Sequence, residues 1–118
     1  MTRSRTAIVV VLVVLFAIAG GVLIYVNQPH GGVTRTIDVS VTGASKMTPS
    51  ELTANLNDTV TINITSDTSG EVHLHGYDIA FECTAGQVTS HTFKADKSGR
   101  FDIEWESTST ALGELVVT

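Results

Sequence analysis

The sequence contains a single cysteine, and few cations lie beyond its first residues. Cys83 cannot form an internal disulfide, so a folded domain must be stabilised by the packing of its core. Arg3 and Arg5 come first; the remaining five Lys and Arg stand against twelve Asp and Glu, a difference of minus seven. This negative charge disfavours nucleic-acid binding, so we expect no nucleic-acid partner.

Catalytic motifs are also missing from the sequence. It has no nucleophile paired with a base, no paired-carboxylate motif, no glycine-rich phosphate loop and no zinc-protease spacing. Asp102, Glu104 and Glu106 alternate along one segment, which is typical of the solvent-exposed face of a strand. The sequence therefore predicts that the protein is not an enzyme.

The longest apolar run covers residues 7–26. It is twenty residues long and has no charge, and at ~1.5 Å per residue it matches the ~30 Å hydrocarbon core of a bilayer. Arg3 and Arg5 precede this run, and the next cation is Arg35, so the positive-inside rule places the N-terminus in the cytoplasm. We expect a single-pass protein of the cell membrane whose C-terminal part is periplasmic or at the cell surface.

A cleaved signal peptide is the alternative interpretation of the same run. Residues 17–19 read A-I-A, a pattern that signal peptidase could cut before Gly20. Against cleavage, residues 22–26 continue the apolar run, and a new N-terminus would expose them to water. The uncleaved interpretation predicts cytoplasmic residues 1–6, a transmembrane helix over 7–26, a linker over 27–32 and one domain over 33–118.

The domain shows the short alternating segments of an all-β protein. Apolar and polar residues alternate with a period of two, and turn residues such as Gly76, Gly86 and Gly99 separate the segments. About seven such strands in this length predict an antiparallel sandwich. Residues 48–57 could hold one helical turn. The predicted strands cover residues 37–41, 60–64, 72–75, 79–83, 91–93, 101–105 and 115–117.

Three stretches of the domain resemble the cupredoxin superfamily. They are residues 58–67, which begin D-T-V-T-I and end S-D; residues 72–78, V-H-L-H-G-Y-D; and residues 93–101, F-K-A-D-K-S-G-R-F. The resemblance is strongest to cupredoxin-like domains of bacterial exported proteins, including those of periplasmic iron-uptake components. It implies a Greek-key cupredoxin-like β-sandwich.

The resemblance carries over only part of a blue-copper site. In blue-copper relatives, the histidine that precedes a small residue and an aromatic is the first copper ligand, and His75, Gly76 and Tyr77 match that pattern. The other family ligands are a Cys, a His and a Met in the loop between the last two strands. Here residues 105–113 read W-E-S-T-S-T-A-L-G, without any of the three. We therefore expect no intact blue-copper site.

Metal could still bind in another way. His73 and His75 are two apart on an extended segment, which places both imidazoles on one face, ~7 Å apart at Cα. A third ligand would have to be Met47, Cys83 or His91. The simpler interpretation is that the histidine pair forms hydrogen bonds, His91 fills an edge position of the core, and Cys83 is a small buried apolar residue.

Two functions follow from these observations. The first is a non-enzymatic extracytoplasmic binding or accessory module beside a membrane-protein partner, with no cofactor. The second is binding or handling of copper or another transition metal by His73 and His75, with a metal-transport partner.

Overall fold

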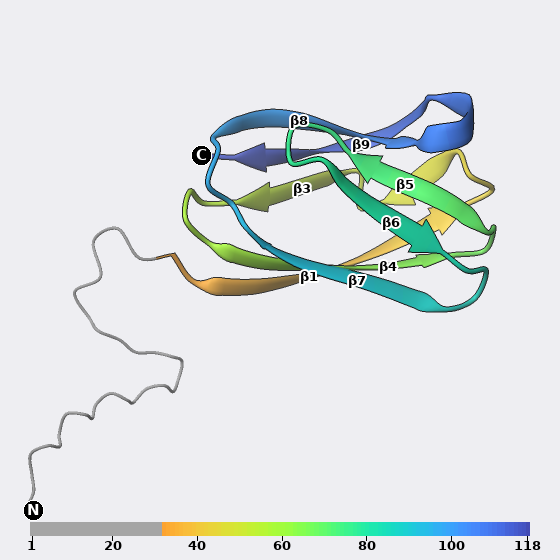
Figure 1. Cartoon of the computed structure of the whole chain (residues 1–118), viewed down its shortest axis with the longest axis horizontal. Helices are drawn as coiled ribbons and strands as arrows, with labels where there is room; N and C mark the ends of the chain where they lie inside the picture. Colours follow the sequence, from red (N-terminus) through yellow and green to blue (C-terminus); the bar gives the residue numbers. More distant parts are fainter. Residues whose placement is uncertain (1–31) are drawn as a thin grey trace, which may run out of the picture. The chain divides into compact units, whose positions relative to one another are not determined.

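A computed structural model describes residues 32–118, which form nine strands and one short 3-10 helix (Figure 1). The cytoplasmic segment predicted for residues 1–6, the span predicted for 7–26 and linker residues 27–31 lie outside the described residues. Within residues 32–118, no helix has the length and apolar character needed to cross a membrane. The predicted all-β class is confirmed for this part of the chain.

Four strands form the first sheet. Its order is β2 (Lys46–Thr48), β1 (Thr34–Thr42), β4 (Thr59–Ser66) and β7 (Val88–Lys94). β1 pairs antiparallel with β2 and parallel with β4, and β4 pairs antiparallel with β7. β2 and β7 are therefore the edges of this four-stranded sheet.

Five strands form the second sheet. Its order is β3 (Glu51–Ala54), β9 (Thr110–Val117), β8 (Gly99–Trp105), β5 (Gly70–Leu74) and β6 (Ile79–Cys83). β3 and β9 are parallel, and the other neighbours are antiparallel. β5 therefore lies between β8 and β6, so His73, and His75 directly after it, are on an inner strand of this sheet and not at its edge.

Two expectations about these elements were wrong. The sandwich is not purely antiparallel, because the β1–β4 and β3–β9 pairs are parallel. Side-chain alternation reports which residues face the core, and it carries no information about the direction of the neighbouring strand. Residues 48–57 contain β3 and no helical turn; Leu52 and Ala54 alternate into the core.

The core lies between the inner faces of the two sheets. Phe81, Leu74 and Leu115 of the five-stranded sheet and Ile62 and Ile64 of the four-stranded sheet are at most 2% exposed. Removal of this apolar surface from water is the main stabilising term, at ~25 cal/mol per Å². The alternating burial of β4, in which every second residue is buried, confirms the strand predicted for residues 60–64.

A buried carboxylate fixes the start of the four-stranded sheet. Asp58, only 1% exposed, accepts hydrogen bonds of 2.8 Å from the Val33 and Asn55 backbone N–H groups and from Arg35 Nε. Burial by itself raises the pKa of the Asp58 carboxyl, but the hydrogen bonds from Asn55, Val33 and Arg35 and the Arg35 charge outweigh it. The pKa therefore lies below its usual value of 3.8.

Candidate functional site

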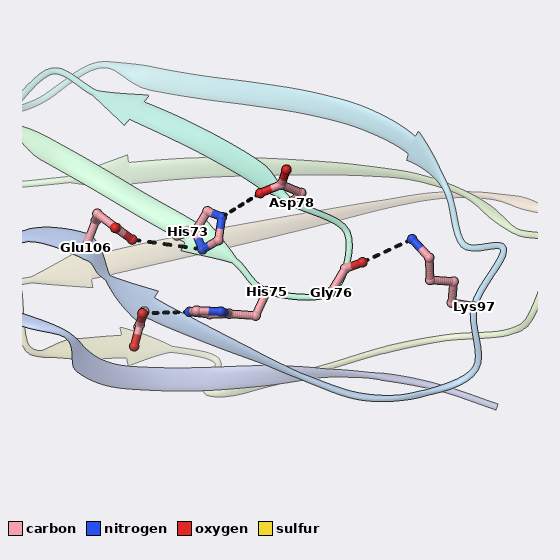
Figure 2. Close-up of polar contacts among 7 residues, drawn as sticks. His73, His75, Gly76, Asp78, Lys97 and Glu106 are labelled. Atoms are coloured by element: carbon pink, nitrogen blue, oxygen red, sulfur yellow. Dashed lines mark hydrogen bonds and ion pairs between the residues drawn. The ribbon is translucent and has the colours of Figure 1, made fainter.

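His73 and His75 lie side by side at the end of β5, next to β8 (Figure 2). Their ring centroids are 4.5 Å apart, and the ring planes meet at 81°. Val72 and Leu74, which alternate with them, are fully buried, so the two imidazoles lie on the outer face of the five-stranded sheet. The prediction that the two histidines share one face is borne out by this geometry.

Two carboxylates flank the His73 ring. Its Nε2 is 3.2 Å from Asp78 Oδ1, and its Nδ1 is 3.9 Å from Glu106 Oε1 (Figure 2). The His73 side chain is 20% exposed, whereas its Nδ1 atom is buried and has no hydrogen-bond partner. His73 is therefore a partly buried imidazole with one nitrogen hydrogen-bonded and the other facing a carboxylate beyond hydrogen-bond distance.

A third carboxylate contacts His75. His75 Nε2 and Glu104 Oε2 are 2.6 Å apart, and the His75 side chain is 45% exposed. Register explains the contact, because Glu104 lies opposite His73 on the neighbouring strand β8. Alternation along the sequence predicted a solvated face for Glu104 and Glu106 and gave no sign of their contacts with the histidines. The strand order needed to find these contacts is not encoded in local alternation.

The turn after His75 is packed tightly against the rest of the domain. Gly76 has φ +84°, and a Cβ there would lie 2.3 Å from Phe101 Cδ1, so a glycine is required. The Tyr77 ring packs 5.1 Å from that of Phe93 and 4.9 Å from that of Phe101. These contacts hold the turn that connects His75 to Asp78.

Lys97 completes the attachment of this turn. The Tyr77 hydroxyl donates to the Lys97 carbonyl at 2.7 Å and accepts from the Lys97 N–H at 3.0 Å. Lys97 Nζ donates to the Gly76 carbonyl at 3.0 Å (Figure 2) and lies 4.8 Å from the centre of the Tyr77 ring. Partial burial raises the pKa of the Tyr77 hydroxyl, and the Asp96 charge raises it slightly further. The hydrogen bond with Lys97 acts in the opposite direction but does not cancel this rise.

The other candidate ligands lie on different strands. Met47 of β2 and Cys83 of β6 are buried among core residues. Burial and the nearby Glu82 charge raise the pKa of the Cys83 thiol, and a hydrogen bond with Thr89 partly offsets this rise. His91 of the edge strand β7 is exposed and packs its ring 4.9 Å from that of the core residue Phe81. Within residues 32–118, no three His, Cys, Asp or Glu side chains stand where they could already hold one metal ion.

The connection between β8 and β9 does not fit the copper ion that the cupredoxin resemblance implies. A short 3-10 helix, η2 (Glu106–Thr108), leads to Ser109, which has φ 55°. Trp105 precedes this helix and is 4% exposed. Its ring packs so closely on Gly70 that a Cβ at that glycine would lie 2.2 Å from Trp105 Cζ2. No thiolate, imidazole or thioether is present in this connection to complete a blue-copper site.

Further negative charge borders the histidine pair. Glu71 of β5 lies directly opposite Glu82 of β6. Desolvation is the largest effect that raises the pKa of the Glu71 carboxyl. The charge of Glu82, a hydrogen bond with Glu82 and the charge of Glu106 raise it by smaller amounts. Like charges opposite each other in a sheet are unfavourable, so the electrostatics of this edge favour any cation that reaches it.

Comparison with known proteins shows what the fold of this domain resembles. No protein-family model matches the sequence, and no curated protein matches it. Solved structures do match: a copper-binding protein in its apo form has a TM-score of 0.63 at 13% identity, over 75% of this chain and 97% of the other. A chain of a heme-copper terminal oxidase dimer has a TM-score of 0.63 at 17% identity, over 97% and 95%.

A variant of amicyanin in its oxidized form matches with a TM-score of 0.52 at 20% identity, over 70% of this chain and 82% of the other. The fold of the domain is cupredoxin-like. The fold implied by the resemblance of residues 58–67, 72–78 and 93–101 is thereby confirmed. Because the identities are only 13% to 20%, the likeness of this cupredoxin-like domain to its neighbours concerns the fold.

Proposed function

We propose that this protein is a membrane-tethered, extracytoplasmic cupredoxin-like domain that acts as a non-enzymatic binding or accessory module for a membrane-protein partner. The observation that carries the proposal is the β8–β9 connection. Its residues Glu106–Thr108 and the buried Trp105 stand where the cupredoxin resemblance would require sulfur and imidazole ligands. A domain without these ligands cannot form the short copper–thiolate bond of blue-copper electron transfer.

Absorption spectroscopy on the copper-loaded full chain in detergent tests the loss of the blue-copper site. We expect no intense band near ~600 nm, because such a band requires a copper–thiolate charge transfer and the buried Cys83 is distant in sequence from the β8–β9 connection. An intense blue band that disappears in Cys83→Ser would contradict the proposal.

Membrane tethering needs its own test. In cells that express the full chain, we expect the protein to remain with the membrane after an alkaline wash, and its domain to be digested by protease added outside the inner membrane. A shorter soluble product that begins at Gly20 would instead support signal-peptide cleavage. Protection of the domain from external protease would contradict the proposed orientation.

The second candidate function is the binding or handling of copper or another transition metal by His73 and His75. The contact of their rings at 4.5 Å favours it, because two neighbouring imidazoles can share one ion. Copper titration by calorimetry on the full chain in detergent, beside the double variant His73→Ala, His75→Ala, separates the candidates. Micromolar or tighter binding that the double variant loses favours metal handling; no binding favours the metal-free module.

A further inference from the structure

We propose that His73 Nδ1, His75 Nε2 and the carboxylates of Glu104 and Glu106 form a site for one divalent transition-metal ion. The inference deepens the second candidate function and rests on it. It adds two ligands that the histidine pattern alone did not identify, and it defines the class of metal.

The state of the His73 ring is the first step of the argument. Its Nε2 is 3.2 Å from Asp78 Oδ1, a hydrogen bond in which only a protonated nitrogen can donate to a carboxylate. In the neutral ring the other nitrogen, Nδ1, then carries a lone pair, and this buried atom has no hydrogen-bond partner. It faces Glu106 Oε1 at 3.9 Å, so two electron-rich atoms face each other unless a cation lies between them.

Asp78 has the role that second-sphere carboxylates have in metal sites. A metal-ligating histidine almost always donates its other ring N–H to a carboxylate or carbonyl, which fixes the tautomer and the direction of the ligating nitrogen. His73 has this arrangement in full, with Asp78 on Nε2 and Nδ1 left for the ion. Contacts of Lys97 with Gly76 and Tyr77 hold the turn that positions Asp78.

Two of the distances among the four groups can be compared with the ligand spacing of a tetrahedral site. With metal–nitrogen and metal–oxygen bonds of about 2.0–2.2 Å, two ligands of one tetrahedral ion are roughly 3.3 Å apart. The 2.6 Å separation of His75 Nε2 from Glu104 Oε2 and the 3.9 Å separation of His73 Nδ1 from Glu106 Oε1 lie on either side of that value. The ring contact at 4.5 Å brings the two pairs together.

Closing the site requires the Glu106 side chain to rotate and the hydrogen bond between His75 and Glu104 to be replaced. As they stand, the four groups hold no ion, because Glu104 is hydrogen-bonded to His75 and Glu106 lies too far from His73. The Glu106 side chain is 50% exposed and can rotate towards His73. The proton between His75 and Glu104 would be released when the metal takes its place.

Ligand chemistry selects the class of metal. Two imidazoles and two carboxylates suit divalent ions such as Cu(II) and Zn(II), whereas Cu(I) prefers thiolate and thioether sulfur. The sulfur-containing side chains of Cys83 and Met47 are buried in the core and cannot contribute. The nearby Glu71 and Glu82 add negative charge without joining the set.

Calorimetric titration of the full chain in detergent with ZnCl₂ and with CuCl₂ at neutral pH tests the site, and Glu104→Gln and Glu106→Gln are the decisive variants. We expect one ion per chain for the unaltered protein and at least tenfold weaker binding for each variant. The matched control is Glu51→Gln, which makes the same change on β3 at the other edge of the sheet. Its affinity should stay within threefold of the unaltered protein.

Electron paramagnetic resonance of the Cu(II)-loaded chain gives a second readout. We expect a signal with nitrogen coupling and without the small copper hyperfine splitting of a thiolate site. Far-UV circular dichroism of each variant shows whether it is folded, and Glu106→Asp, which keeps the carboxylate, should retain more affinity than Glu106→Gln.

The outcomes separate this inference from the functions proposed above. Binding that is lost in the double histidine variant but unchanged in Glu104→Gln and Glu106→Gln would overturn the four-ligand site and leave histidine-based metal handling intact. Equal weakening by Glu51→Gln would mean general attraction of cations to an acidic face. No binding of either metal would overturn both metal proposals and leave the metal-free module.

Discussion

The outer face of the four-stranded sheet is lined by hydroxyl and amide side chains, whereas that of the five-stranded sheet is lined by carboxylates. On the first, Thr61 and Thr92 are joined at 2.8 Å, and Asn63 bonds Asp38 at 2.9 Å and Ser90 at 2.5 Å. These side chains form hydrogen bonds with one another across the strands of this face.

The five-stranded sheet places carboxylates opposite carboxylates. Glu71 lies opposite Glu82, and Glu114 has Asp102 on one side and Glu51 on the other. Arg100 pairs with Glu114, but no other Lys or Arg of the described residues forms an ion pair on this sheet. One outer face therefore carries hydrogen bonds between neutral and charged side chains across its strands, whereas the other has unbalanced negative charge beside two histidines.

The largest expected effect tests whether the two sheets share one core. Phe81→Ala in β6 should lower the free energy of unfolding by about 3–5 kcal/mol, because Phe81 is 1% exposed and its removal leaves a cavity. Urea unfolding followed by Trp105 fluorescence and by far-UV circular dichroism should give one coincident transition. Separate transitions would show that the sheets unfold independently.

The next effect concerns the four-stranded sheet alone. Asp58→Asn should cost roughly 3 kcal/mol, because it removes the charge that pairs with Arg35. The pKa of Asp58 is lowered in the folded state, so its stabilisation is present above pH 3.8, its usual value, and is lost as the pH falls through the folded value. Urea midpoints between pH 7 and pH 2 should show this loss in the unaltered protein and not in Asp58→Asn.

A smaller effect tests the inner face of the five-stranded sheet. Cys83→Ser should cost about 1 to 2 kcal/mol, because it places a hydroxyl in an apolar site. Burial also raises the pKa of the Cys83 thiol, so the native protein should react with a thiol reagent far more slowly than the urea-unfolded protein. Equal reaction rates would show that Cys83 is accessible in the folded protein and that the core does not shield it.

The smallest effect compares the outer faces directly. Glu71→Gln should raise the urea midpoint slightly at pH 7, because it relieves repulsion from Glu82. Because the pKa of Glu71 is raised in the folded state, the protonated side chain stabilises the fold below pH 4.5, its usual pKa, and this stabilisation is lost as the pH rises. The gain in urea midpoint from Glu71→Gln should therefore disappear at pH 3. Thr61→Val on the other sheet provides the contrast, with no dependence on pH or salt.

Local sequence predicted much of the fold. Alternation at β4, β6 and β8 identified the buried residues correctly, and residues 101–105 direct Phe101, Ile103 and Trp105 inwards as expected. It also placed His73 and His75 on one face. The last strand was predicted for residues 115–117 but begins at Thr110. The prediction missed this start because a register shift opposite Ile103 and Glu104 interrupts the alternation there.

The candidate site was only partly predictable. The histidine pair follows from a spacing of two, but its carboxylate neighbours come from β8 and η2, about thirty residues later in the chain. Asp78 is the exception, since it lies in the same turn, yet its φ of 57° and contact with His73 depend on how that turn packs.

The sequence by itself determined the apolar run, the acidic charge, the all-β class and the absence of Cys, His and Met between the last two strands, because these depend on composition and on a period of two. Tertiary structure alone decided that β1 and β3 pair in parallel with β4 and β9, and that Glu104 and Glu106 face the histidines. Strand order and register depend on how the two sheets bury their shared core, and that packing is a property of the whole domain.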